Sequence, residues 1–225
     1  LEETCEALEA IDREDWDRLR DELGDVLLQV VFHAQLAAER GEFDIGQVCA
    51  GIVRKLRHRH PHVFGEVQVS GSAEVLDRWE QLKRHEDGYQ ERVSALDGVP
   101  RQLPALQRAL KLQKRAAKVG FDWPDAEGPR RKVDEELAEL DRAERGQLEH
   151  ELGDLLFAVV NLARCLDLEP ESALRRAVAR FETRFRAMEQ AAGGTEALRQ
   201  LTLPEMDRLW EQAKAAERSD PDRER

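Results

Sequence analysis

The sequence predicts an all-α protein made of two tandem units of one design. Three observations indicate this class: apolar residues recur with helical spacing, no segment reads as a credible strand, and one acidic motif occurs twice. Of the 225 residues, 36% are charged and only 5% are aromatic, which suits amphipathic helices better than a β-sandwich. We therefore expect two units that each resemble a four-helix bundle, with the bundles completed by homodimerisation.

Glycine and proline residues divide the helical pattern into separate segments. Gly41 ends one helix, Pro61 stops another, and the run from Gly120 to Pro129 reads as a loop. The stretch 26–32 is apolar on nearly all sides, as in a helix buried in a bundle or a subunit interface. The predicted helices span residues 1–12, 16–40, 44–60, 72–86, 105–118, 130–145, 147–167, 170–191 and 203–217.

The internal repeat sets the domain boundaries. Residues 22–36 (ELGDVLLQVVFHAQL) align with residues 151–165 (ELGDLLFAVVNLARC), an offset of 151 − 22 = 129. The chain opens at Leu1 inside a helical pattern and without an initiator Met, so we expect the first unit to be truncated at its start. The predicted divisions are a first unit at 1–96, a linker with a helix and a GFDWP loop at 97–129, a second unit at 130–217 and a disordered tail at 218–225.

Each unit carries two pairs of acidic residues at helical spacing. Residues three apart share a helix face, with Cβ atoms roughly 5–6 Å apart. If two such helices pack together, the carboxylates converge, and like charges so close need a cation to neutralise them. The alternative is a solvated acidic face. The predicted metal ligands are Glu136, Glu139, Glu151 and Asp154 in the second unit and Glu3, Glu6, Glu22 and Asp25 in the first.

Oxygen ligands of this kind suit Mg²⁺, with Mn²⁺ as a substitute. The metal would screen the charge of a phosphate group and lower the pKa of a bound water. Glu135 lies beside the predicted cage and either contacts the substrate or assists proton transfer. The predicted catalytic residues are Glu135, Glu136, Glu139, Glu151 and Asp154.

Three cations at helical spacing could bind a polyphosphate. Lys132 precedes Glu136 by four residues and can reach a phosphate from the same face. Arg180 and Arg184 are also four apart and form a two-pronged cationic face. For each cation, a surface ion pair is the alternative interpretation.

Three further side chains are candidates for contact with a nucleotide. Trp210 and Lys214 share a helix face and could meet a base and a phosphate, although core packing is the usual role of tryptophan. Trp79 and Lys83 repeat this pair in the first unit. Asn161 stands where the first unit has Phe32, and it either binds a base or sugar or is a satisfied polar group of the core. The predicted nucleotide-binding residues are Lys132, Glu135, Asp154, Asn161, Arg180, Arg184, Trp210 and Lys214.

Two glycines lie inside predicted helices at equivalent positions of the repeat. Gly24 and Gly153 each cost roughly 0.8–1.0 kcal/mol relative to alanine. We expect the close approach of a neighbouring helix at the metal site to offset this cost.

Composition narrows the range of partners. A net charge of −12 argues against a nucleic acid polymer, which needs a basic surface. No apolar run approaches the roughly 20 residues that span a bilayer, so no membrane partner is expected. Cys5, Cys49 and Cys165 form no CxxC pair and are odd in number, which favours a reducing cytoplasm.

The acidic motifs and four longer strings resemble one known family. Glu-Glu-x-x-Glu followed by Glu-x-x-Asp, together with RHRHPHVFG, SALDGVPRQLPAL, KRAAKVGFDW and ELGDLLFAVVNLAR, is similar to the all-α nucleoside triphosphate pyrophosphohydrolases of the MazG type in their tandem bacterial form. The resemblance covers nearly the whole chain. The departure is at the start, where a motif that precedes the first acidic group in relatives is absent.

The resemblance implies a magnesium-dependent homodimer that hydrolyses nucleoside triphosphates, ATP among them, to a monophosphate and pyrophosphate. Water would attack the α-phosphate, and the role would be nucleotide-pool housecleaning or a stress response. We expect the second unit to be the catalytic copy, because Lys132 and Asn161 have no counterpart in the first. The alternative is a non-catalytic helical dimer that binds a cation or a regulatory partner.

Overall fold

The computed structural model describes residues 2–64 and 93–218, and every regular element in these ranges is a helix. Contacts within the chain divide it into two compact units, Leu1–Glu91 and Arg92–Arg225. The predicted all-α class is confirmed. The predicted helix at 72–86, with Trp79 and Lys83, lies outside the described residues, as does nearly all of the predicted tail at 218–225.

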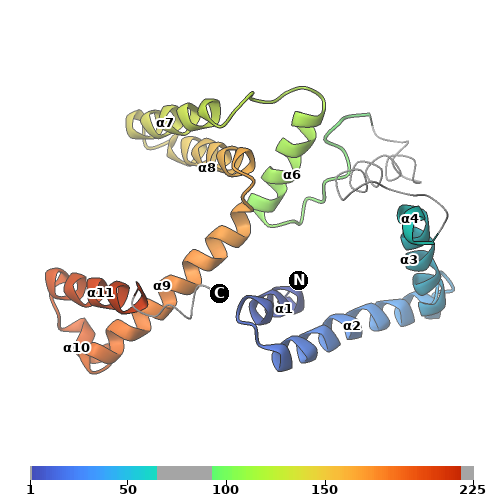
Figure 1. Cartoon of the computed structure of the whole chain (residues 1–225), viewed down its shortest axis with the longest axis horizontal. Coiled ribbons are helices and arrows are strands. Elements are labelled where there is room, and N and C mark those ends of the chain that lie inside the picture. Colours follow the sequence, from blue (N-terminus) through green and yellow to red (C-terminus); the bar gives the residue numbers. More distant parts are fainter. Residues whose placement is uncertain (1, 65–92, 219–225) are drawn as a thin grey trace. The chain divides into compact units, whose positions relative to one another are not determined.

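The first unit is built on a hairpin of two helices. Helix α1 (Glu2–Asp12) packs against α2 (Trp16–Glu39), and the small side chains of Ala7 and Ala10 are buried on α1. Asp15 caps α2 by accepting a hydrogen bond from the backbone N–H of Arg18. Helices α3 (Ile45–Arg59) and α4 (Pro61–Phe64) follow (Figure 1). The hairpin brings the acidic residues of α1 to those at the start of α2.

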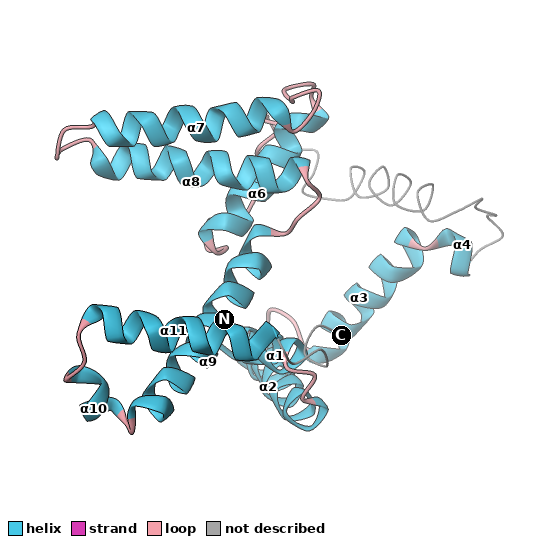
Figure 2. Cartoon of the chain, turned by 60° about the vertical axis from the view of Figure 1, so that its left-hand side comes forward, coloured by secondary structure: helices cyan, strands magenta, loops and turns pink. Residues whose placement is uncertain are grey.

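The second unit repeats this hairpin and adds further helices. Helices α7 (Glu127–Arg142) and α8 (Leu148–Cys165) lie side by side, and α6 (Ala105–Lys118) packs against α8 (Figures 1 and 2). The long helix α9 (Pro170–Ala192) leads away from this pair, and the short α10 (Thr195–Arg199) turns the chain so that α11 (Leu203–Arg218) packs on α9. The interval 97–129, predicted as a linker, thus supplies a helix that packs within the second unit.

Local sequence explains where these helices begin and end. Helix α9 has Pro170 in its first turn, is capped by Glu169, and ends at Gly193 in the left-handed conformation with φ 89°. The predicted loop through Pro129 is wrong at its end, because α7 already begins at Glu127. Proline is tolerated in the first turn of a helix, where its missing N–H would have no helical partner. The sequence prediction also missed the short helices α4 and α10.

The expected reason for the two helical glycines is wrong within the described part of the chain. A Cβ atom added at Gly24 or Gly153 would meet no neighbouring atom within 4 Å. Among these residues, therefore, no helix approaches either glycine closely. A close approach occurs instead at Gly128, where a Cβ atom would overlap the ring of Trp123.

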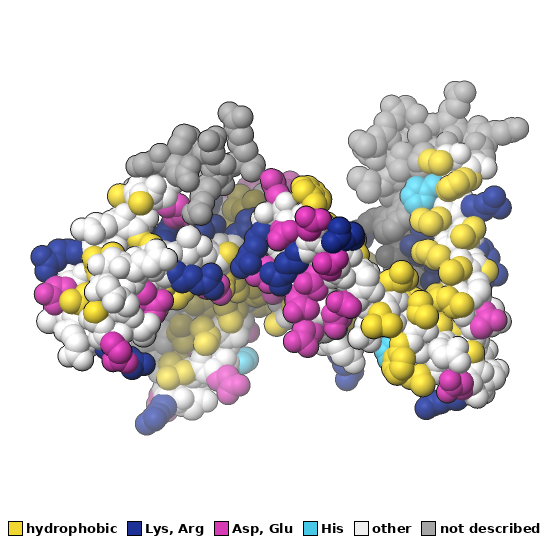
Figure 3. All heavy atoms as spheres, turned by 90° about the horizontal axis from the view of Figure 1, so that it is seen from below, with side chains coloured by type: hydrophobic (Ala, Val, Ile, Leu, Met, Phe, Trp, Pro, Cys, Tyr) yellow, Lys and Arg dark blue, Asp and Glu magenta, His cyan; other side chains and the backbone are white. Residues whose placement is uncertain are grey.

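Large apolar side chains remain exposed in both units. In α2 they include Leu27, Leu28 and Phe32, and in α8 and α9 they include Leu156, Phe157 and Phe181. Figure 3 shows hydrophobic side chains spread over the visible face of the first unit. Exposed apolar area on this scale is typical of an interaction surface. In the described residues, no helix is long and apolar enough to cross a membrane.

Candidate metal and nucleotide site

Three of the predicted metal ligands of the second unit converge where α7 packs on α8. Glu136 and Glu139 come from α7 and Glu151 comes from α8, and each offers one carboxylate oxygen within 4.8 Å of the others. Glu136 is only 5% exposed, although it is acidic. A buried carboxylate requires a cation or strong hydrogen bonds, because leaving its charge unpaired away from water is costly.

Lys132 supplies part of that compensation. Its Nζ lies 2.6 Å from Oε1 of Glu136 and 2.9 Å from Oε1 of Glu135. Hydrogen bonds to Glu136 first and Glu135 second raise the pKa of Lys132 above its ordinary value. One lysine thus carries a positive charge between two carboxylates at the edge of the acidic group.

The first unit assembles the same group of acids with a different cation. Glu3, Glu6 and Glu22 each offer an oxygen within 4.8 Å of the others. Arg18 donates from Nε to Oε1 of Glu22 at 3.2 Å and from Nη2 to Oε2 of Glu9 at 3.3 Å. The pKa of Glu6 is raised, chiefly by the negative charge of Glu22, then by loss of solvent and by Glu3. A bound cation would reduce this repulsion between the carboxylates.

The structure does not bring the predicted aspartates into either group. Asp25 and Asp154 lie outside the two sets of three converging carboxylates. Asp154 is 47% exposed at its side chain, and its Oδ2 lies 3.4 Å from Nε2 of His150. Each aspartate follows its glutamate by three residues, so it stands at the margin of the carboxylate group.

The donor set fits a hard divalent cation. All three converging groups in each unit are carboxylates, and neither histidine nor cysteine belongs to either set. Mg²⁺ prefers oxygen ligands and retains several waters, so a few carboxylates suffice to hold it. The residues that could hold such an ion in the second unit are Glu136, Glu139 and Glu151.

The predicted phosphate- and base-binding residues of α9 and α11 form a separate cluster. Nε of Arg184 donates to Oε2 of Glu217 at 2.7 Å, and its guanidinium lies 5.6 Å from the ring centroid of Trp210. Lys214 is paired with Glu211 at 2.8 Å, and Arg180 is exposed. Because α9 leads away from α7 and α8, one chain does not bring this cluster to the carboxylates (Figures 1 and 2).

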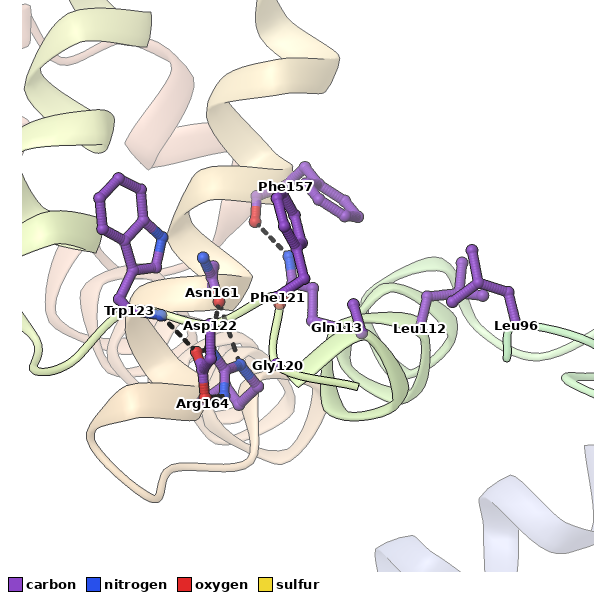
Figure 4. Close-up of a pocket in the computed structure, with 11 residues that line it drawn as sticks. Leu96, Leu112, Gln113, Gly120, Phe121, Asp122, Trp123, Phe157, Asn161 and Arg164 are labelled. Carbon is purple, nitrogen blue, oxygen red and sulfur yellow. Dashed lines mark hydrogen bonds and ion pairs between the residues drawn. The ribbon is translucent and has the colours of Figure 1, made fainter. Parts of the chain in front are cut away.

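Asn161 lines a cavity beside α8. The cavity has a volume of about 620 Å³ and lies between α6, α8 and the loop 120–123 (Figure 4). Oδ1 of Asn161 accepts hydrogen bonds from Nε and Nη2 of Arg164 at 3.0 and 2.9 Å. Other lining residues are Leu96, Leu112, Gln113, Ala116, Phe121, Asp122, Trp123 and Phe157.

Sequence reasoning gave no role to Gln113, Asp122 or Arg164. Nη1 of Arg164 donates to Oδ2 of Asp122 at 3.1 Å, and this pair ties the loop to α8. The GFDW run indicated a loop, but nothing in the sequence indicates that it packs against α8. A long-range contact of this kind has no local signal.

The fold and the site together define an all-α protein with paired carboxylates on an antiparallel helix hairpin. The family model of the MazG nucleotide pyrophosphohydrolase domain matches residues 1–64 and 132–188, once in each unit. The chain belongs to this family, and it is an enzyme of the pyrophosphohydrolase class.

Several curated proteins are similar over nearly the whole chain. The nucleoside triphosphate pyrophosphohydrolase of Escherichia coli K12 is 50% identical over 225 residues, covering 96% of this chain and 85% of that protein. The nucleoside triphosphate pyrophosphohydrolase/pyrophosphatase MazG of Thermotoga maritima is 44% identical over 219 residues, covering 96% and 84%. The nucleoside triphosphate pyrophosphohydrolase of Mycobacterium tuberculosis is 32% identical over 218 residues, covering 94% and 57%.

Proposed function

We propose that this chain hydrolyses nucleoside triphosphates to nucleoside monophosphates and pyrophosphate at the carboxylate group of the second unit. Mg²⁺ is the proposed cofactor, and Mn²⁺ can replace it. The names of relatives up to 50% identical support the reaction. The observation that carries the site is the convergence of Glu139 and Glu151 on the buried Glu136.

The chemistry is a displacement at the α-phosphorus. Water forms the new bond, the bond to the oxygen that bridges to the β-phosphate breaks, and pyrophosphate leaves with that oxygen. When bound, the divalent ion screens the phosphate charge and lowers the pKa of the attacking water. Glu136, Glu139 and Glu151 hold the ion, with Asp154 at their margin.

The neighbouring residues act on the substrate and the proton. Lys132 stands four residues before Glu136 and can exchange one carboxylate partner for a phosphate oxygen, since both are anionic acceptors. Release of Glu135 in that exchange would leave its carboxylate beside the reacting water, where it can accept the proton. Burial of the substrate phosphates against Lys132 would replace solvent contacts with fixed positive charge.

We further propose that the functional form is a homodimer. The cations and the tryptophan of α9 and α11 are far from the carboxylates of the same chain, yet both sets suit one nucleotide. The exposed apolar side chains of α2, α8 and α9 provide faces that a second copy would cover. In such a dimer, Arg180, Arg184, Trp210 and Lys214 of one copy would complete the site of the other.

A cytoplasmic role in clearing unwanted nucleotides or in a stress response is compatible with this activity. The three cysteines are free, as in a reducing compartment. A substrate bound through its phosphates and a metal would also tolerate several bases.

The test is pyrophosphate release from a panel of ribo- and deoxyribonucleoside triphosphates with and without Mg²⁺. The wild-type chain should release pyrophosphate only with the metal. Glu136→Ala should lower the rate by about 100-fold or more, because it removes a ligand of the ion that stabilises the developing charge. Glu3→Ala, at the equivalent position of the first unit, is the matched control and should retain most of the activity.

Three results would contradict the proposal in different ways. Absence of pyrophosphate from every triphosphate would favour a non-catalytic dimer that binds a cation. Equal loss in the two variants would show that both units contribute. Loss with Glu3→Ala alone would move the active site to the first unit.

A further inference from the structure

Arg18 joins the two helices of the first hairpin (Figure 1). It lies in the first turn of α2, where its Nε donates to Oε1 of Glu22 at 3.2 Å. Its Nη2 donates to Oε2 of Glu9, which lies on α1, at 3.3 Å. A guanidinium presents several N–H donors in one plane, so it can hold two carboxylates at once. Arg18 therefore bonds one carboxylate on each helix.

This arginine is placed to neutralise the acidic group of the first unit. Glu22 belongs to the three converging carboxylates, and its side chain is only 14% exposed. Glu9 lies three residues after Glu6 and extends the acidic face of α1. The pKa of Glu6 is raised chiefly by Glu22, and the charge of Arg18 opposes that rise. The guanidinium thus acts on the group as a whole, and it does not lose its charge, because arginine is not deprotonated in proteins.

Little apolar surface holds α1 to α2. The buried side chains of α1 are those of Ala7 and Ala10, which are single methyl groups. A methyl group contributes much less hydrophobic stabilisation than a leucine or phenylalanine side chain. The first hairpin therefore depends on its ion pairs between helices more than a hairpin with large apolar side chains at the interface would.

The second hairpin lacks both partners of this bridge. The acids of its first helix follow those of α1 at an offset of 136 − 3 = 133, so Arg142 stands where the first unit has Glu9 (9 + 133 = 142). On the second helix the offset is 151 − 22 = 129, and Gln147 stands where the first unit has Arg18. The sequence of the second unit thus cannot form the same contact between its helices.

The ion pairs among the described residues of the second hairpin each lie within one helix. Lys132 bonds two glutamates of its own helix α7, and His150 pairs with Asp154 on α8. The three converging carboxylates are contributed by both helices, so an ion held by them would join α7 to α8. These carboxylates are those of Glu136, Glu139 and Glu151. In the second unit, the connection that Arg18 makes in the first is left to such an ion.

We propose that Arg18 bridges the first hairpin in the role that the divalent ion has in the second. The inference rests on the proposed function for the ion of the second unit, and it assigns a different chemistry to the first. A divalent ion that approached the acids of the first unit would meet a group already partly neutralised, and the fixed guanidinium would repel it. The first hairpin therefore closes without metal and binds a divalent ion weakly, whereas the second gains stability from the ion.

Hydrogen exchange measured by mass spectrometry tests the two hairpins separately in the full chain, because each yields its own peptides. In the wild-type chain, replacing EDTA by Mg²⁺ should slow the exchange of α7 and α8 and leave that of α1 and α2 unchanged. Arg18→Met should speed the exchange of α1 and α2 in EDTA roughly two- to fivefold, the loss of a partly exposed ion pair. Mg²⁺ should then slow it again, because the acidic group has lost its internal cation.

Arg20→Met is the matched control for this measurement. Arg20 lies on the same helix as Arg18, and it bonds Asp17 and Asp21, which are also on α2. The substitution removes an equal charge without breaking a bond to α1. It should leave the exchange of both hairpins unchanged, with Mg²⁺ and without it.

A metal titration tests the charge directly. Free Mn²⁺ is counted by electron paramagnetic resonance in Glu136→Ala, which removes a proposed ligand of the second unit so that the first unit dominates binding. Adding Arg18→Met to this chain should tighten Mn²⁺ binding about tenfold or more, because a fixed positive charge beside the group is removed. Adding Arg18→Lys, which retains the charge, or Arg20→Met should change it less than about twofold. Circular dichroism melting checks that each variant is folded.

Three results would overturn the role of Arg18. They are a slowing of α1 and α2 by Mg²⁺ in the wild-type chain equal to that in Arg18→Met, equal effects of Arg18→Met and Arg20→Met, and Mn²⁺ binding that Arg18→Met leaves unchanged. Failure of the proposed function looks different. A chain that releases no pyrophosphate, or whose α7 and α8 ignore Mg²⁺, loses the reaction or the ion of the second unit, and it retains the role of Arg18 where the first hairpin behaves as expected.

Discussion

The two units share their acidic groups and differ in what surrounds them. In the first unit, Arg18 is the cation that contacts the acidic group. It lies on the second helix of the hairpin and donates a hydrogen bond to Glu22. In the second unit the cation is Lys132, which comes from the first helix and bonds the buried Glu136. At the repeat offset of 129, the position of Arg18 is taken by Gln147 (18 + 129 = 147). Among the residues that the structure describes, the carboxylate from the second helix is thus paired with a cation in the first unit only.

A second difference lies further along the same helices. The first unit has Phe32 where the second has Asn161, and Phe32 is more than half exposed. In the second unit α6 and the loop 120–123 cover that stretch of α8 and form the cavity. The two units therefore carry equivalent groups of acids beside different neighbouring residues.

The largest expected effect is the difference in kcat/KM between substitutions of Lys132 and of Arg18. Lys132→Met should lower kcat/KM for nucleoside triphosphates roughly 10- to 100-fold, because a charge-assisted hydrogen bond to phosphate is lost. Arg18→Met should change kcat/KM less than about twofold, because Arg18 contacts the acidic group of the first unit, which lies outside the proposed active unit. Steady-state pyrophosphate release measures both. A larger loss with Arg18→Met would reverse the assignment of the two units.

The next effect tests the contact between Gly128 and Trp123. Gly128→Ala should lower the free energy of unfolding by about 1–3 kcal/mol, because the added methyl group overlaps the ring of Trp123. Denaturant unfolding monitored by tryptophan fluorescence measures it. Gly146→Ala is the control, since a methyl group there meets nothing within 4 Å. Equal effects in the two variants would show that Trp123 is free to move.

Substitution of the two helical glycines of the repeat should change the free energy of unfolding by less, and in the opposite direction. Gly153→Ala and Gly24→Ala should each raise the free energy of unfolding by about 0.5–1 kcal/mol, because alanine has the higher helix propensity and the chain leaves space for it. Thermal or denaturant unfolding at low protein concentration is the measurement. Destabilisation that grows with protein concentration would instead show a second copy packed on these glycines.

The smallest expected effect is a pH dependence of the free energy of unfolding. The hydrogen bond from Arg164 holds the pKa of Asp122 below its ordinary value of 3.8, with burial acting in the opposite direction and the Trp123 N–H in the same one. A lowered pKa in the folded state stabilises the fold above 3.8, and this contribution is lost as the pH falls through the folded-state pKa.

Asp122→Asn should therefore lower the free energy of unfolding by about 0.5–1 kcal/mol near pH 7, a typical value for a partly exposed ion pair. The difference from the wild-type chain should shrink in acid. Asp141→Asn, at an exposed position of α7, should show no such trend. A difference that stays constant down to pH 2 would mean that the pair contributes no charge-dependent stability.

Much of the fold could be predicted because helices leave periodic signals. The spacing of apolar residues placed α2, α3, α6 and α9 within a residue or two, since caps and breakers such as Asp44 and Gly193 act locally. Pro129 misled the prediction of the start of α7, because proline breaks a helix interior and is tolerated in a first turn. The acidic spacing also predicted that the three glutamates of each unit converge, but it wrongly added Asp25 and Asp154, because spacing along one helix does not decide which side chains reach the neighbouring helix.

The sequence alone determined the helical class, the tandem repeat and the pairing of acids within each helix, because all three follow from periodicity and identity along the chain. Tertiary structure decided which acid became buried, which cation neutralised it, and that α6 and the loop 120–123 enclose a cavity against α8. These outcomes depend on contacts between residues far apart in the sequence, such as Gln113 with Phe157 and Arg164 with Asp122. No local pattern specifies such contacts, because packing selects them from many that helical periodicity would equally allow.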